Sequence, residues 1–173
     1  MDLLEQFKQI TTFVFDVDGV LTDGSLLVLD DGQMVRHMNI KDGYAIQLAL
    51  KKGYRVVIIT GGNSEAVRDR LNKLGVMDVF IGVDNKKESL VNYVTRHQLS
   101  WNQILFMGDD IPDYVVMQLV GMACAPRDAA PEIKHISKYI SPVAGGHGCA
   151  RDVIEKVLKL NDNWPLDTTV TSK

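Results

Sequence analysis

Five short runs of residues, separated by amphipathic segments, limit the possible folds of this chain most strongly. They are residues 12–17, 55–60, 79–81, 104–107 and 122–125. Several of the runs are continuously apolar, as strands covered by helices on both faces must be. Apolar strands that alternate with helices predict an α/β fold with a doubly wound, mainly parallel, Rossmann-like sheet.

The segments between these runs carry the start and stop signals of helices. The first expected helix covers residues 43–52, with Asp42 as its N-cap and Gly53 at its end. The second is capped by Asn63 or Ser64 and reaches Leu74, before Gly75. The others are residues 86–97, 111–120 and 149–160.

One segment, residues 24–39, breaks the alternation. Its sequence GSLLVLDDGQMVRHMN predicts a β-hairpin about the Asp-Asp-Gly turn at residues 30–32. The four apolar residues at 26–29 offer side chains to both faces, and a two-stranded hairpin alone is marginally stable in water. We therefore expect the hairpin to pack against other copies of the chain in a homo-oligomer.

Length and composition narrow the class of protein. A chain of 173 residues suits one domain, residues 1–160, followed by a polar tail, residues 161–173, expected to be loose unless a partner holds it. The net charge of −3 argues against a nucleic-acid-binding protein, which would need a stripe of basic residues on its surface. No apolar run is long enough to cross a membrane. Cys124 and Cys149 form no CxxC motif, and residues 1–10 do not read as a signal peptide, so we expect a cytoplasmic protein.

Polar residues suited to phosphoryl transfer follow several predicted strands. They are Asp16 and Asp18, Thr60 with Gly61, Lys86, and the acidic run GDDIPD at residues 108–113. Because ligands bind beyond the carboxyl ends of parallel strands, we expect these groups to meet at one edge of the sheet.

Each group has a chemical use there. Asp16, held by its strand, can attack phosphorus, and Asp18 can protonate the leaving oxygen and then activate water. A phosphate dianion beside two ionised aspartates leaves an excess of negative charge that Lys86 alone does not balance. Since each like-charge pair costs about 4 kcal/mol at about 4 Å and an effective dielectric constant near 20, a divalent cation such as Mg²⁺ is expected.

These residues together resemble the four motifs of the haloacid dehalogenase superfamily of phosphohydrolases: DVDGVLTD from Asp16, TGG from Thr60, Lys86, and GDDIPD. The resemblance implies that Asp16 is the nucleophile and Asp18 the general acid/base. It also implies Mg²⁺ held by Asp16, the Asp18 carbonyl and Asp109, with Asp110 and Asp113 in support.

A narrower resemblance, over almost the whole chain, is to the subfamily of 3-deoxy-D-manno-octulosonate 8-phosphate phosphatases. Its members lack a cap domain, and here only a hairpin and one helix fit between the first two motifs. The resemblance implies a tetramer joined through the hairpins, with neighbouring chains closing the site, and a role in lipopolysaccharide biosynthesis. The substrate contacts it implies are Asp18, Asn39, Ile40, Lys41, Asp42, Gly43, Thr60, Gly61, Gly62, Arg70 and Lys86.

Other interpretations remain open at this stage. Many relatives carry arginine at the position of Gly62, and relatives acting on nine-carbon keto-deoxy sugar acids tend to carry glutamate, so a nine-carbon 9-phosphate is the alternative substrate. A phospho-receiver domain shares the residue types, but its phosphoacceptor follows the third strand. A non-catalytic homologue is a third possibility.

The GGHG segment at residues 145–148 lacks the features of a nucleotide-binding loop and is interpreted as a turn near the site.

Overall fold

A six-stranded sheet organises the computed structural model, which describes residues 2–171. Its order is β5-β4-β1-β6-β7-β8, and all neighbouring strands pair in parallel. The strands are β1 (Thr12–Phe15), β4 (Arg55–Ile59), β5 (Asp78–Phe80), β6 (Ile104–Met107), β7 (Met122–Ala125) and β8 (Tyr139–Ile140). The predicted doubly wound α/β fold is confirmed. The sequence did not reveal β8, because two residues are too few to form a recognisable apolar run.

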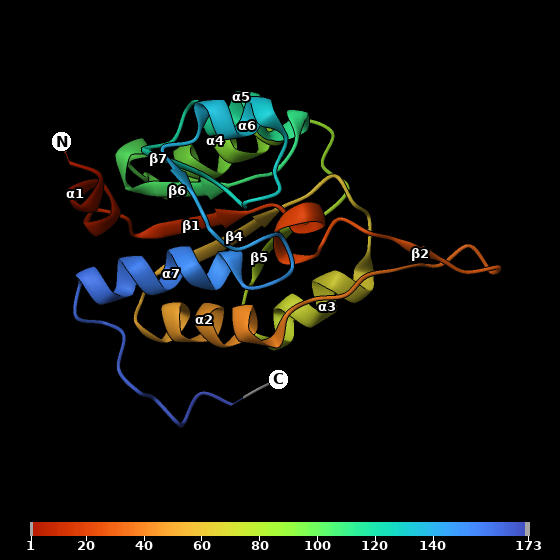
Figure 1. The fold of residues 1–173 in the computed structure, drawn as a ribbon, viewed down its shortest axis with the longest axis horizontal. Coiled ribbons are helices and arrows are strands. Elements are labelled where there is room, and N and C mark those ends of the chain that lie inside the picture. Colours follow the sequence, from red (N-terminus) through yellow and green to blue (C-terminus); the bar gives the residue numbers. More distant parts are fainter. Residues whose placement is uncertain (1, 172–173) are drawn as a thin grey trace.

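Helices cover both faces of the sheet (Figure 1). One layer contains α1 (Leu3–Lys8), α2 (Ile40–Lys51), α3 (Glu65–Lys73) and α7 (Cys149–Leu160). The other contains α4 (Lys86–His97), α5 (Tyr114–Met117) and α6 (Pro131–Ile136). Three short helical turns, η1 (Val17–Leu21), η2 (Trp101–Gln103) and η3 (Ile111–Asp113), lie beside strand ends.

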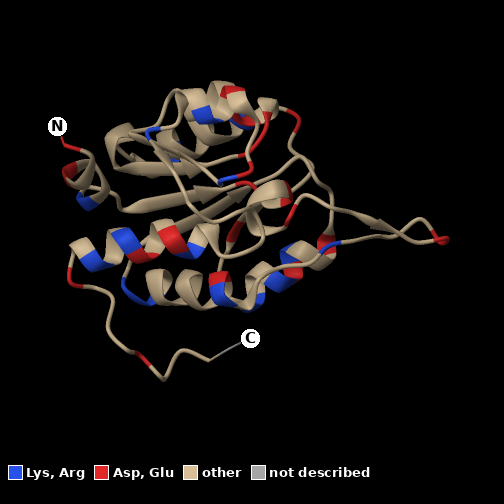
Figure 2. Ribbon diagram, in the orientation of Figure 1, with Lys and Arg blue, Asp and Glu red and all other residues tan. Residues whose placement is uncertain are grey.

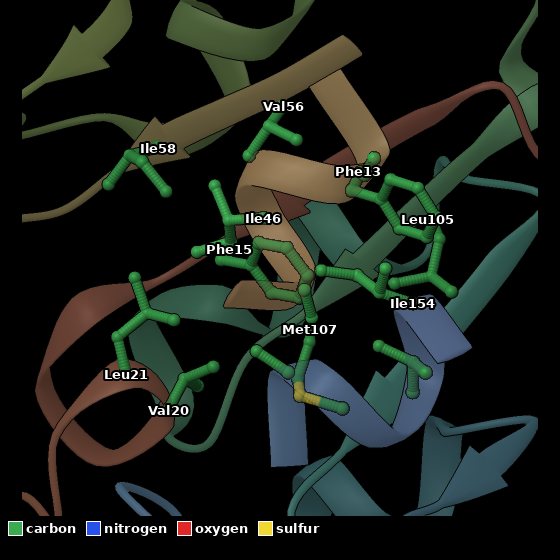
Figure 3. Packing of buried hydrophobic residues seen from close by; sticks show 14 of the residues in the cluster. Phe13, Phe15, Val20, Leu21, Ile46, Val56, Ile58, Leu105, Met107 and Ile154 are labelled. Atoms are coloured by element: carbon green, nitrogen blue, oxygen red, sulfur yellow. The ribbon is translucent and has the colours of Figure 1, made fainter. Parts of the chain in front are cut away.

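The central strand β1 divides the core in two. Phe13 and Phe15 point to the α2 and α7 side, where Figure 3 shows them with Met107 and Ile154. Val14 points to the opposite side, toward α4 and α5. All four residues of β1 are buried, as expected of a strand covered on both faces. This packing holds the carboxyl end of β1, where the acidic residues begin, in a fixed position.

Two predicted helix boundaries were wrong. Helix α2 begins at Ile40, not at residue 43, and Asn39 caps it by accepting a hydrogen bond from the Lys41 N–H. Asp42 lies within the first turn instead, buried, and its Oδ1 accepts a 2.7 Å hydrogen bond from the Arg151 N–H of α7. The expected helix over residues 111–120 is η3 followed by α5, which ends at Met117.

The predicted hairpin is confirmed. Strand β2 (Leu27–Val28) pairs antiparallel with β3 (Met34–Val35), and the pair projects away from the body of the molecule (Figure 1). Leu27 is 58% exposed and Val28 is 65% exposed, so the apolar surface of the hairpin is uncovered within one chain.

The C-terminal tail is held by the chain itself. Trp164 packs edge to face on Tyr44 of α2, and the Arg151 guanidinium lies 5.3 Å from the centre of the Trp164 ring. Lys51 also forms a 2.7 Å ion pair with Asp167. The described part of the tail therefore stays against α2 and α7 without another chain; Ser172 and Lys173 lie outside the described residues.

The contacts of Trp164 predict a measurable contribution to stability. Trp164→Ala removes an aromatic pair and a cation–π contact, so we expect it to lower the free energy of unfolding by about 1–2 kcal/mol. Urea titration followed by circular dichroism measures this. Leu166→Ala is the matched control, because Leu166 is 98% exposed. Equal stability of the two variants would contradict a docked tail.

Candidate active site

The loop after β1 carries the first carboxylate of the site. Asp16 is buried, and its Oδ1 accepts a 2.7 Å hydrogen bond from the Val17 N–H. The chain then forms the wide turn η1, closed by the hydroxyl of Thr22, which accepts from the N–H groups of Gly19 and Gly24. These bonds fix the direction in which Asp16 and Asp18 leave the strand.

Gly19 brings this loop against the acidic loop after β6. Its φ of +85° lies in the left-handed region, and a Cβ there would collide with the carboxylate of Asp109. On the other side, a Cβ on Gly145 would collide with the Gly19 carbonyl. The turn at residues 145–148 therefore lies beside the site, as predicted.

Lys86 joins three of the loops. It is the first residue of α4, which Asn85 caps, and its side chain is only 6% exposed. Its Nζ lies 2.9 Å from Asp16 Oδ2 and 2.7 Å from Asp113 Oδ1. Burial lowers the pKa of Lys86, but the two carboxylates outweigh this and hold the pKa above its usual value. Lys86 is therefore a buried cation between two acids.

A third carboxylate makes the cluster strongly acidic. One oxygen each from Asp16, Asp109 and Asp113 lie within 4.8 Å of one another. Burial and the charge of Asp113 raise the pKa of Asp16 to about 6. Burial and the neighbouring carboxylates, Asp16 first, raise the pKa of Asp109 to about 7.

This donor set fits a divalent cation. Carboxylate oxygens are the ligands that Mg²⁺ prefers, and a cation would relieve the repulsion that raises these pKa values. Asp16 and Asp109 were predicted as ligands, and Asp113 was predicted in support. The carboxylate of Asp113 also accepts hydrogen bonds from Lys86 Nζ and from the Asp109 N–H. Asp110 caps η3 through a hydrogen bond from the Ile111 N–H. Ligation by the Asp18 carbonyl stays a prediction.

A cavity of about 310 Å³ opens over the cluster. The predicted site residues that line it are Asp16, Asp18, Thr60, Gly61, Gly62, Lys86, Asp109, Asp110 and Asp113. Figure 2 shows the acidic loops gathered beyond β1. The structure thus brings together groups that are up to 97 residues apart in the sequence, since Asp16 and Asp113 both belong to the cluster.

The other predicted substrate contacts do not line this cavity. Asn39 donates a hydrogen bond to the Gly146 carbonyl, and Asp42 faces α7. Arg70 lines a larger cavity, of about 850 Å³, between the hairpin and α3. Ile40, Lys41 and Gly43 are absent from the lining as well. Their contact with a substrate stays a prediction that this single chain does not test.

Sequence reasoning missed Arg36. Its Nε donates a 2.7 Å hydrogen bond to Asp18 Oδ1, and its Nη2 lies 3.2 Å from Asp18 Oδ2. No spacing rule marks an arginine in a hairpin as the partner of an acid 18 residues earlier. Its only local signal is its position directly after the second strand of the predicted hairpin, where the chain returns toward the sheet.

Comparisons with known proteins agree with this fold and cavity. Residues 75–152 match the family model of the haloacid dehalogenase-like hydrolases. The 3-deoxy-D-manno-octulosonate 8-phosphate phosphatase of Escherichia coli (strain K12) is 32% identical over 91% of this chain and 84% of the relative. The crystal structure of the enzyme of that name from Yersinia pestis has a TM-score of 0.90 at 30% identity, covering 93% of this chain and 87% of the other.

A structure from Moraxella catarrhalis is similar as well. This 3-deoxy-D-manno-octulosonate 8-phosphate phosphatase, in complex with a magnesium ion, a phosphate ion and a KDO molecule, has a TM-score of 0.89 at 29% identity and covers 92% of each chain. Fold and cavity thus define a haloacid dehalogenase-like hydrolase. Within that class, the chain belongs to the family of 3-deoxy-D-manno-octulosonate 8-phosphate phosphatases. This membership sets aside the receiver-domain interpretation.

The acidic cluster predicts how stability depends on pH and Mg²⁺. With pKa values of about 6 for Asp16 and about 7 for Asp109, against 3.8 for the ordinary carboxyl, the folded protein holds protons that the unfolded chain has lost. These groups therefore lower the free energy of unfolding as pH rises from about 4 to 7. Because Mg²⁺ binds the ionised carboxylates, we expect it to raise Tm much more at pH 8 than at pH 5.

Asp109→Asn tests the assignment, with Asp30→Asn on the exposed hairpin as control. Thermal unfolding with and without MgCl₂ should show a smaller Mg²⁺ effect and greater metal-free stability at pH 8 for Asp109→Asn, and wild-type behaviour for the control. An equal Mg²⁺ shift in wild type and Asp109→Asn would place the metal elsewhere.

Proposed function

We propose that this protein hydrolyses 3-deoxy-D-manno-octulosonate 8-phosphate in a Mg²⁺-dependent reaction through an aspartyl-phosphate intermediate. The observation that carries the proposal is the contact of Lys86 with both Asp16 and Asp113 beneath a small acidic cavity. Family membership supports the substrate. We also propose a role in lipopolysaccharide biosynthesis, which the likeness to the phosphatases of this family supports.

The chemistry of each step follows from the positions of the side chains. Asp16 attacks phosphorus, so that a bond forms between its carboxylate oxygen and phosphorus while the bond to the sugar oxygen breaks. Asp18 gives its proton to the departing oxygen, which leaves as an alcohol. Asp18 then takes a proton from water, whose oxygen attacks phosphorus and releases inorganic phosphate and free Asp16.

Neutral and cationic groups of the cavity hold the phosphoryl oxygens. The hydroxyl of Thr60, which accepts a 3.2 Å hydrogen bond from the Gly62 N–H, and the N–H group of Gly61 lie in the loop after β4. Lys86 offsets negative charge on nucleophile and phosphate. A bound Mg²⁺, held by Asp16 and Asp109 with Asp113 in support, would neutralise further charge on the phosphoryl group.

The substrate assignment has one close alternative. A nine-carbon keto-deoxy sugar acid 9-phosphate presents the same phosphate ester and carboxylate. Gly62 carries neither of the side chains that distinguish the two branches. A comparison of kcat/KM on the eight- and nine-carbon esters decides between them, because discrimination between substrates resides in that ratio.

The nucleophile is tested by Asp16→Asn. Removing the attacking carboxylate should lower kcat at least about 10³-fold on 3-deoxy-D-manno-octulosonate 8-phosphate with excess Mg²⁺, measured by phosphate release. The amide keeps the shape of the side chain, so the variant should remain folded by circular dichroism. Asp69→Asn, at an exposed position of α3, is the matched control and should retain full activity. Substantial turnover by Asp16→Asn would exclude the aspartyl-phosphate route.

We also infer a homotetramer joined through the hairpins, acting in the cytoplasm. The uncovered apolar side chains of β2 and β3 support the assembly, because an exposed patch of this kind marks an interaction surface. Cys124 and Cys149 are buried and free, which suits a reducing compartment. No helix within residues 2–171 is long and apolar enough to cross a membrane.

The assembly predicts the effect of a charge in the hairpin. Leu27→Asp should convert the oligomer to smaller species in light scattering after gel filtration, because a carboxylate would have to be buried at the interface. Met77→Asp, at a site that is 79% exposed on the body of the molecule, should leave the mass unchanged. A monomeric wild-type protein at micromolar concentration would contradict the inference.

A further inference from the structure

The hairpin places a cation beside the active-site cavity: Arg36 lines the neighbouring cavity of about 850 Å³ and contacts Asp18, which lines the active-site cavity. Arg36 follows β3, and its guanidinium contacts both carboxylate oxygens of Asp18, at 2.7 and 3.2 Å. Its remaining terminal nitrogen donates a 3.1 Å hydrogen bond to the Met34 carbonyl, which fixes the guanidinium to the hairpin backbone. The Arg36 side chain is 9% exposed, whereas that of Asp18 is 33% exposed. Arg36 is therefore the more buried member of the pair.

Gly62 leaves room for this pair. A Cβ at position 62 would lie 3.0 Å from Asp18 Oδ2 and 3.2 Å from Arg36 Nη2, both tighter than ordinary contacts. A larger side chain there would push against the guanidinium and the carboxylate. The Asp18 carboxylate thus lies between Gly62, in the loop after β4, and Arg36 of the hairpin.

We propose that Arg36 positions Asp18 for proton transfer to the leaving oxygen. This inference rests on the function proposed above. A planar guanidinium that contacts both carboxylate oxygens fixes the plane of the carboxylate, which a single-point cation does not. One oxygen can carry the proton while the other keeps its bond to Arg36. Arg36 touches Asp18 and not the reacting atoms, so it is a positioning residue.

The need for an acid depends on the leaving group, and this dependence supplies the test. Nitrophenolate departs readily without a proton, whereas phenolate is more basic and gains more from an acid. Neither 4-nitrophenyl phosphate nor phenyl phosphate carries a sugar acid, so contacts with that part of the substrate do not enter. Arg36→Met should lower kcat/KM on phenyl phosphate about 10- to 100-fold, and on 4-nitrophenyl phosphate at most about three-fold.

A conservative variant and a matched control complete the design, with one substitute variant held in reserve. Arg36→Lys, which keeps the charge but not the paired contact, should fall between wild type and Arg36→Met on phenyl phosphate. Arg68→Met removes an arginine of α3 that pairs with Glu65, and should match wild type on both esters. Thermal unfolding and the Mg²⁺-induced shift in Tm identify any variant that fails to fold. If Arg36→Met fails to fold, Arg36→Gln is measured in its place.

The outcomes separate this inference from the proposed function. Equal losses on the two aryl esters, or a change confined to KM for the sugar-acid phosphate, would overturn positioning by Arg36 and leave the phosphatase assignment standing. A wild-type protein that hydrolyses no phosphate ester with Mg²⁺ would overturn both. A steeper dependence on the leaving group in Arg36→Met, with partial rescue by lysine, supports the inference.

Discussion

The ammonium group of Lys86, buried between Asp16 and Asp113, is the interaction on which the rest of the site depends. It joins the end of β1, the start of α4 and the turn η3, which the sequence separates widely. Removing one partner of a buried ion pair typically costs about 3–5 kcal/mol, because a charge remains without compensation. The same contact holds the proposed nucleophile in place, so the stability of the site and its chemistry rest on one side chain.

Lys86 does not neutralise the cluster, and this imbalance is what makes the site reactive. Asp16, Asp109 and Asp113 lie close enough that burial and mutual repulsion raise two of their pKa values. A protein usually avoids such an arrangement, since it lowers stability at neutral pH. A divalent cation held by these carboxylates would restore the balance and supply positive charge for a phosphoryl group. The family membership of the chain agrees with this physical account of the acidic residues.

Two peripheral segments, the hairpin and the C-terminal tail, pack back against the body of the chain, and the hairpin extends the site beyond the sheet. The hairpin contributes Arg36 to Asp18, while its apolar strands stay exposed on the outside. Arg151 of α7 packs on Trp164 of the tail, and its backbone N–H binds Asp42, so the tail and α2 meet at the start of α7. An assembly that fixes the hairpin would also fix Arg36. The proposed oligomer and the position of the proposed acid/base, Asp18, therefore depend on the same hairpin.

The sequence by itself determined five of the six strands of the sheet, the helices α3, α4 and α7, and the convergence of Asp16, Asp18, Thr60, Lys86 and Asp109. Apolar periodicity is a local property, and the carboxyl ends of parallel strands necessarily share one edge. Only the tertiary structure decided that Arg36 contacts Asp18, that Asp42 faces α7 instead of capping α2, and that the tail lies on Tyr44. These contacts join residues that no strand brings together. They depend on how loops and helices pack across long separations, and a side chain carries no local signal of which distant partner that packing will supply.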